Sequence, residues 1–204
     1  MTESTASQKA NVVQLAGPAL SDREIVAGLL DRDERAAAAL FNRYGDKINR
    51  LVWRLLGADD EHHDVVHQVF VNILGSIHKL KDPLAIENWL TGITVNTVRR
   101  EIRSRKYRRI LVPTGSDYPE HISDGTESDQ QILVRRVFAI LNKMRSEDHI
   151  VFGLRFIEGN TIDEVAIAGG YSLATAKRRI ARAKKEFRKR AQKDSFLAPV
   201  FGGK

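Results

Sequence analysis

The sequence predicts an all-α protein made of two small helical domains joined by an acidic, flexible linker. Apolar residues recur at three- and four-residue steps through most of the chain, which is the spacing of one face of an α-helix. No segment alternates between apolar and polar residues for long enough to indicate a half-buried strand. Residues 111–128 are rich in proline, glycine and acidic side chains and divide the chain in two.

The composition limits the classes of function. The 204 residues include 33 Lys and Arg against 26 Asp and Glu, and the formal net charge of +7 favours a polyanionic partner. Cysteine is absent, which excludes disulfides and thiolate metal sites. No apolar run is long enough to span a bilayer, and the start of the chain lacks the features of a signal peptide. We therefore expect a cytoplasmic protein without membrane insertion.

The first domain is expected at residues 21–110, after a flexible tail at residues 1–20. Ser21 and Glu24 form a capping box just before a cluster of apolar residues, Ile25, Val26, Leu29 and Leu30. The next two helices carry apolar stripes expected to be buried, namely Ala37, Leu40, Phe41, Tyr44, Ile48, Leu51, Val52 and Leu55, and then Val65, Val66, Val69, Phe70, Ile73, Leu74 and Ile77.

The last helix of the first domain begins at Asp82-Pro83, a favourable N-cap followed by proline at the first helical position. Trp89 lies on its apolar face, and this position favours a core role over stacking on a nucleobase. The helix becomes strongly basic from Arg99 onward. Cations in such a row are suited to the backbone of single-stranded DNA.

The second domain is expected at residues 129–193, followed by a loose C-terminal tail at residues 194–204. One of its helices carries Ile150, Val151, Leu154 and Phe156. Thr161 and Glu164 form a capping box that opens a short helix, Gly169-Gly170 supplies a turn, and Ser172 caps a long helix.

The long helix after Ser172 has two different faces. Its apolar face consists of Leu173, Ala176, Ile180, Ala183 and Phe187, and its opposite face carries Arg178, Arg182, Lys185 and Lys189. Two capped helices joined by a tight turn, the second of them basic, are typical of a helix-turn-helix whose second helix enters the major groove of DNA.

Both halves resemble the bacterial sigma-70 family. Residues 155–159, 161–166 and 172–183 are similar to sigma region 4, and residues 64–70 resemble region 2.2. Trp89-Leu90 with Ile93 and Asn96, together with the arginine-rich stretch that follows, resembles regions 2.3 and 2.4. Because no region 3 domain is recognisable, the resemblance is to the compact extracytoplasmic-function (ECF) group.

The resemblance implies a protein that binds core RNA polymerase at the β′ clamp and the β flap and directs it to promoter DNA, with an anti-sigma factor as a further partner. It implies no enzymatic activity, cofactor or metal. The acidic linker would run through the polymerase cleft. The residues implied to read the −35 element are Ser172, Ala174, Thr175, Lys177, Arg178, Arg179, Arg182 and Lys185.

The remaining implied sites lie in the first domain. Recognition and melting of the −10 element would involve Asn96, Arg99, Arg100, Arg103, Arg105 and Lys106. Binding to the polymerase would involve Asp64, His67, Gln68, Phe70 and Val71.

Three positions depart from the family pattern. His67-Gln68 replaces a Gln-Glu pair and removes a carboxylate from the expected polymerase contact. Gly169 stands where leucine is usual, which predicts a loosened helix-turn-helix. Gly92 lies inside the helix that would melt DNA, where glycine costs about 1 kcal/mol relative to alanine.

Other readings of the sequence stay open. His63 and His67 have a spacing compatible with a metal site on a helix, but no His-Glu-x-x-His order or third ligand accompanies them. A helix-turn-helix regulator that never joins the polymerase would share the second domain, but it would leave the region 2 resemblance unexplained. A degenerate sigma-like protein would bind the polymerase without starting transcription.

Overall fold

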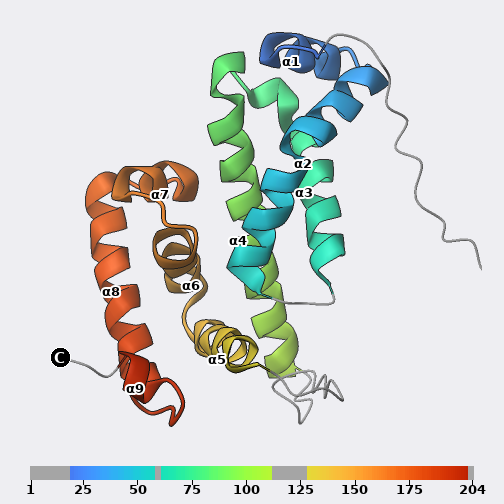
Figure 1. The fold of residues 1–204 in the computed structure, drawn as a ribbon. Coiled ribbons are helices and arrows are strands. Elements are labelled where there is room, and N and C mark those ends of the chain that lie inside the picture. The colour runs from blue at the N-terminus through green and yellow to red at the C-terminus, as the bar shows by residue number, and fades with distance from the viewer. Residues whose placement is uncertain (1–18, 58–60, 112–127, 202–204) are drawn as a thin grey trace, which may run out of the picture.

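The computed structural model describes residues 19–57, 61–111 and 128–201. All regular secondary structure in these ranges is helical, so the predicted all-α fold is confirmed. The helices form an N-terminal unit (residues 22–111) and a C-terminal unit (residues 129–201) that lie side by side (Figure 1). None of the described helices is both long enough and apolar enough to cross a membrane.

The N-terminal unit contains four α-helices. Its elements are α1 (Asp22–Leu30), α2 (Glu34–Leu56), α3 (His62–Ser76), the 3₁₀ turns η1 (Ile77–Lys79) and η2 (Pro83–Ala85), and α4 (Ile86–Leu111). Helices α2, α3 and α4 run alongside one another, and α1 lies across one end of them (Figure 1). The basic half of α4 extends toward the C-terminal unit, which places its arginines near the boundary between the units.

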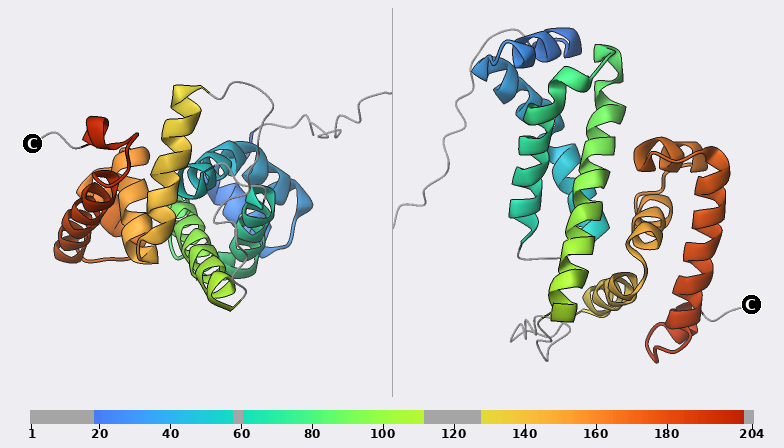
Figure 2. Two further views of the ribbon diagram at one scale, coloured as in Figure 1. Left: turned by 90° about the horizontal axis from the view of Figure 1, so that it is seen from below. Right: turned by 180° about the vertical axis from the view of Figure 1, so that it is seen from behind.

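The C-terminal unit begins where the chain resumes at Ser128. Its elements are α5 (Asp129–Lys143), α6 (Ser146–Phe152), the π-helical turn η3 (Gly153–Ile157), α7 (Ile162–Gly169), α8 (Leu173–Ala191) and α9 (Ala198–Phe201). Viewed from behind, α6 lies between α8 and the N-terminal unit (Figure 2).

The local sequence accounts for several of the helix starts. Capping boxes form as predicted at Ser21 and Thr161, where the N-cap side chain accepts from the backbone three residues on and a glutamate accepts in return. Ser128 forms a third one with Gln131. Asp82 accepts from the Leu84 N–H, but it caps the turn η2 and not α4, which begins three residues after Pro83 at Ile86.

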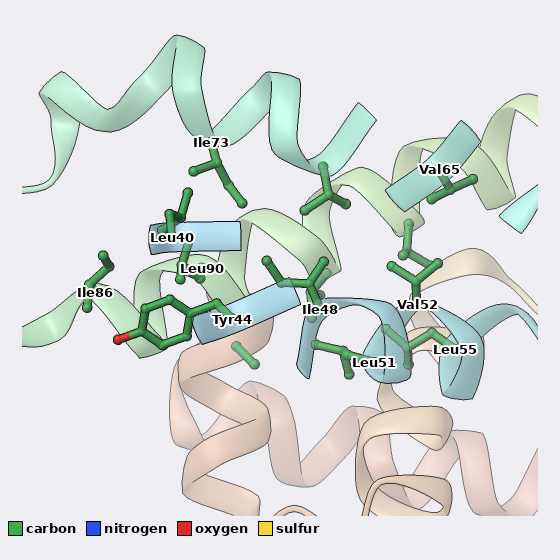
Figure 3. Packing of buried hydrophobic residues seen from close by; sticks show 14 of the residues in the cluster. Leu40, Tyr44, Ile48, Leu51, Val52, Leu55, Val65, Ile73, Ile86 and Leu90 are labelled. Atoms are coloured by element: carbon green, nitrogen blue, oxygen red, sulfur yellow. The ribbon is translucent and has the colours of Figure 1, made fainter. Parts of the chain in front are cut away.

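The larger hydrophobic core is formed mainly by α2, α3 and α4. In Figure 3, Ile48, Val52 and Leu55 of α2 lie beside residues of α3 and α4. This core continues into the C-terminal unit, because it includes Ile150, Val151, Leu154, Val165 and Ala168. Trp89 is half-buried against the same core, in line with the core role favoured for it.

A second, smaller core lies within the C-terminal unit. Phe187 of α8 stacks on Phe152 at a ring-centroid distance of 4.3 Å and meets the edge of Phe201 at 5.3 Å. Leu197 is fully buried in this core. The prediction of a loose tail after Lys193 is therefore wrong for residues 194–201, which fold back over the end of α8 because their apolar side chains complete its core.

Several residues expected in buried stripes are exposed instead. Leu30, Phe41 and Leu74 each directly follow a fully or almost fully buried residue, at Leu29, Leu40 and Ile73. Neighbouring helical positions are 100° apart, and in these three pairs the second residue points away from the core. Phe156 and Leu173 are also exposed, in the turn after α6 and at the first position of α8.

The two units meet in a defined boundary. The His149 ring of α6 donates through Nε2 to the Leu55 carbonyl of α2 at 2.8 Å, and His149 is fully buried. A Cβ added at Gly153 would lie 2.7 Å from Leu55 Cδ2, so glycine allows η3 to approach α2 closely. An ion pair of 2.7 Å joins Arg54 to Glu158 across the same boundary.

Some sequence predictions fall outside the described residues. These concern the N-terminal tail up to residue 18, the start of the third helix at residues 58–60, the acidic linker at residues 112–127, and residues 202–204.

Candidate nucleic-acid interface

Helices α7 and α8 form the helix-turn-helix motif. Gly170 has φ 69° and ends α7 in the left-handed conformation that glycine adopts without steric cost. The Tyr171 N–H donates to the Ala166 carbonyl at 2.8 Å, and Ser172 caps α8 by accepting from the Thr175 N–H. The turn is therefore fixed by backbone and cap hydrogen bonds on both sides.

Gly169 leaves no gap in this motif. A Cβ added there would lie 2.6 Å from Cδ2 of Tyr171, so the tyrosine ring occupies the space that a larger residue at position 169 would need. The prediction that the missing leucine loosens the motif is wrong, because its neighbour Tyr171 fills that space. Gly92 differs, since nothing lies within 4 Å of an added Cβ at that position.

The outward face of α8 carries most of the side chains predicted to read the −35 element. Ser172, Ala174, Lys177, Arg178 and Lys185 are exposed. Thr175 is half-buried beneath the Ser172 cap, with its hydroxyl 2.9 Å from Ser172 Oγ. The exposed cations and small polar residues at the start of α8 suit contact with base edges and phosphates.

Two other members of this set are already paired. Arg182 donates to both carboxylate oxygens of Asp148, including an Nη2–Oδ1 distance of 2.6 Å, and this bond raises the pKa of Arg182. Arg179 lies 2.5 Å from Glu147. Both acidic residues belong to the first turn of α6, where the negative charge of a carboxylate also interacts favourably with the helix dipole.

The set predicted to contact the −10 element is divided in the same way. Asn96 and Arg100 are exposed on α4. Arg99 is only 12% exposed and Arg103 pairs with Glu147 across the unit boundary. The two further cations are engaged as well, Arg105 with Glu101 and Glu61, and Lys106 with the Met144 carbonyl.

A groove between α3 and α4 lies next to Asn96 and Arg100. One pocket of ≈ 280 Å³ is lined by both of these residues and by Trp89, together with Asn72, Ser76, Lys79, Ile93 and Thr97. A second pocket of ≈ 440 Å³ shares Asn72, Thr97 and Arg100 with it. Amide and hydroxyl groups next to an indole and a guanidinium can hydrogen-bond and stack with an unpaired base.

The residues predicted to bind polymerase lie on α3, and four of the five are on the face away from the core. Asp64, His67, Gln68 and Val71 are exposed, whereas Phe70 is half-buried. Phe70 contacts Phe41 of α2 at a ring-centroid distance of 5.1 Å, and Phe41 is 52% exposed. Exposed Leu74 extends this apolar surface, which is the kind of surface that protein partners cover.

No metal site emerges from the part of the chain that the structure describes. Within it, no group of three or more His, Cys, Asp or Glu side chains could hold a metal ion. His62, which neighbours the His63 considered for a metal site, is hydrogen-bonded to Asn49 at 2.7 Å.

Comparison with known proteins relates the chain to sigma factors. Residues 40–108 match the family model of Sigma-70 region 2. The ECF RNA polymerase sigma-E factor of Haemophilus influenzae is 25% identical over 183 residues, which cover 85% of this chain and 96% of the relative. The chain is therefore similar to an ECF sigma factor over most of its length.

A second relative carries the same kind of description. The ECF RNA polymerase sigma factor SigW of Bacillus subtilis is 24% identical over 167 residues, which cover 77% of this chain and 89% of the relative. In fold, the chain resembles CnrH, solved in complex with the cytosolic domain of CnrY. The TM-score is 0.57 at 23% identity, covering 85% of this chain and 99% of CnrH.

The sequence revealed most of these surfaces but missed some of their residues. Phe41 and Leu74 were assigned to the core but are exposed. Their position after a buried residue is no signal of this, because neighbours such as Leu51 and Val52 are both buried. Asn72, Ser76 and Lys79 line the groove from α3 and η1. Only the packing of α3 beside α4 brings them to Asn96.

Proposed function

We propose that this protein is a sigma factor of the ECF type that binds core RNA polymerase and directs it to promoters, with α8 reading the −35 element and the groove between α3 and α4 receiving the −10 element. The observation that carries the proposal is the exposed row of polar and cationic side chains along the first turns of a capped helix-turn-helix. The groove beside Asn96 and Arg100 supports a separate site for unpaired bases.

The proposed polymerase surface is the exposed part of α3 with the Phe41–Phe70 pair. We place the β′ clamp here, with Asp64, His67 and Gln68 at its polar edge. The β flap would contact the C-terminal unit. Because CnrH was solved with the cytosolic domain of another protein, CnrY, we also propose a protein partner of anti-sigma type that covers the same surfaces.

We assign one proposed role to each predicted part of the chain. Residues 21–110 would bind polymerase and the −10 element, residues 129–193 would bind the −35 element, and residues 111–128 would be the linker. The protein would act in the cytoplasm as a binding protein, without catalysis or a cofactor.

In vitro transcription on a promoter library with purified core polymerase tests this proposal. We expect initiation only when the protein is present. Co-purification with the core would exclude a regulator that never joins the polymerase, and transcripts would exclude a sigma-like protein that cannot initiate. If the core neither binds nor initiates with the protein, the proposed function is wrong.

Arg178→Ala tests the assignment of α8. It should reduce binding to the selected −35 sequence by about 1–3 kcal/mol and relax base preference, because a bidentate contact to a base would be lost. Lys184→Ala is the matched control, since it removes one exposed cation of α8 outside the proposed reading set. Equal promoter profiles for the two variants would refute the assignment.

A further inference from the structure

A single carboxylate gathers cations from both proposed DNA-binding surfaces. Glu147 Oε2 lies 2.5 Å from Arg179 of α8 and 3.5 Å from Arg99 of α4, and its other oxygen pairs with Arg103 of α4. The side chain of Glu147 is 23% exposed, so these pairs are partly shielded from solvent. Shielding strengthens ion pairs relative to those on an open surface.

Tyr171 holds this cluster together. Its hydroxyl donates to Glu147 Oε2 at 2.5 Å and accepts from Arg99 Nη2 at 2.9 Å. The Arg179 guanidinium lies 4.2 Å from the centre of its ring. Arg99 also donates to the Gly169 carbonyl at 3.0 Å. The tyrosine that fits against Gly169 therefore completes a link between the helix-turn-helix and α4.

The cluster keeps Glu147 ionised. Partial burial acts to raise its pKa, but the hydrogen bond from Tyr171 and the charges of Arg99, Arg179 and Arg103 outweigh burial and lower it. An anionic group surrounded by three guanidinium groups and a hydroxyl resembles the arrangement by which proteins bind phosphate.

We propose that Glu147 is an internal substitute for a DNA phosphate, which keeps Arg99, Arg103 and Arg179 occupied in the free protein until DNA or polymerase displaces it. This inference rests on the proposed function. It adds that DNA binding by the free chain is limited by competition from within the protein, and that Tyr171 positions the competing carboxylate.

The reach of the folded chain supports an exchange of partners. Promoter elements centred at −35 and −10 are about 25 base pairs apart, or roughly 85 Å of duplex at 3.4 Å per base pair. A compact body of the residues that the structure describes, 19–57, 61–111 and 128–201, is only about 40 Å across. The arrangement in which Glu147 joins α4 to α8 therefore differs from any arrangement that spans both elements, so the cluster must separate on a promoter.

Glu147→Gln tests the proposal, with Glu158→Gln as its matched control. Glu158 is 24% exposed and also pairs with an arginine across the unit boundary, but its partner Arg54 is outside the proposed DNA-binding sets. Both substitutions remove one negative charge, so a general gain in net charge affects both variants equally. The probe is a fluorescein-labelled duplex of random sequence, whose binding by the free protein is measured by anisotropy at several salt concentrations.

We expect Glu147→Gln to bind this duplex about fivefold or more tightly than Glu158→Gln. The slope of the logarithm of its affinity against the logarithm of the salt concentration should be steeper by about 2–3, since up to three more cations can contact phosphates. Tyr171→Phe, which keeps the ring and loses the hydroxyl, should give a smaller gain in the same direction and replaces Glu147→Gln if that variant does not fold.

Equal affinities and equal salt slopes for the Glu147 and Glu158 variants would overturn the inference. Promoter-library transcription with core polymerase is run on the parent protein in parallel. Transcription by the parent with no difference between the variants would refute only the role of Glu147. A parent that fails to initiate would refute the proposed function, whatever the free protein does with DNA.

Discussion

The two hydrophobic cores of this protein differ in which parts of the chain form them. The larger one draws on every helix of the N-terminal unit and also on α6, η3 and α7. The smaller one joins α5, α8 and α9 with Phe152 at the end of α6. The helix-turn-helix is thus divided: α7 packs largely on the first core, and most of the buried face of α8 belongs to the second.

This difference shows that the linker in the sequence does not mark the boundary between the two hydrophobic cores. Residues 129–193 read as one domain in sequence because a proline- and glycine-rich segment precedes them. In the folded chain, however, Leu154 and Val165 are completely buried in the larger core, which is formed mainly by α2, α3 and α4. The comparison predicts different consequences for substitutions in the two cores.

Leu154→Ala should have the largest effect. Removing this fully buried side chain should lower the free energy of unfolding by about 3–5 kcal/mol, through lost burial and the cavity left behind. Because Leu154 belongs to the shared core, backbone amides of both units should lose protection in hydrogen exchange.

Phe187→Ala is the contrasting change in the second core. Its loss in stability should be of similar size, but amides of α2 and α3 should keep their protection. If the two variants lose protection in the same helices, the distinction between a shared and a local core is wrong.

His149 should make the shared boundary sensitive to acid. Burial, partly opposed by the bond to the Leu55 carbonyl, lowers the pKa of His149 from 6.5 to about 4. The unfolded chain therefore binds the proton more readily between pH 6.5 and 4. The stability that neutral, buried His149 contributes is complete above about pH 6.5 and is lost as the pH falls through that window. The loss should reach about 3 kcal/mol at pH 4.

Denaturant titrations of the parent and His149→Gln across this pH range measure that contribution. The variant cannot be protonated, so its free energy of unfolding should fall less steeply below pH 6.5. Parallel profiles for the two proteins would show that His149 does not titrate at the boundary.

Gly169→Ala should destabilise the C-terminal unit by about 1–3 kcal/mol, because the new methyl group overlaps the Tyr171 ring. In a Tyr171→Ala background the same change should cost little, since the obstructing ring is gone. Thermal unfolding of the four proteins of this double-mutant cycle measures the coupling. Additive effects would contradict the interlock between the two residues.

Gly92→Ala should have the smallest effect and the opposite sign. Gly92 is inside α4 and an added Cβ meets nothing within 4 Å, so alanine should stabilise the N-terminal unit by up to about 1 kcal/mol. A loss of stability on thermal unfolding would show that this glycine is required by packing.

The features that the sequence predicted well depend on neighbouring residues. Local sequence was enough to predict the helix caps at Ser21, Thr161 and Ser172 and the turn at Gly170, because each depends on residues within a few positions of one another. The exposed polar face of α8 could be predicted for the same reason, since helical periodicity alone places Arg178 and Lys185 away from the buried face.

The features that the sequence missed depend on tertiary contacts. A row of arginines on α4 predicts positive charge, but only the docking of α6 shows that Arg99 and Arg103 already face Glu147. Charge counted along a chain therefore overstates the charge that is available to a ligand. One local signal was present, since the unusual Gly169 is followed at close range by the bulky Tyr171 that takes up its space.

The short α9 segment has a practical consequence for anyone who trims or fuses this chain. A deletion placed where the basic residues stop, after Lys193, would take away Leu197 and the ring of Phe201 and leave Phe187 facing water. Such a shortened protein would tend to aggregate, and its loss of activity would say nothing about promoters. Purification handles are better kept clear of this end.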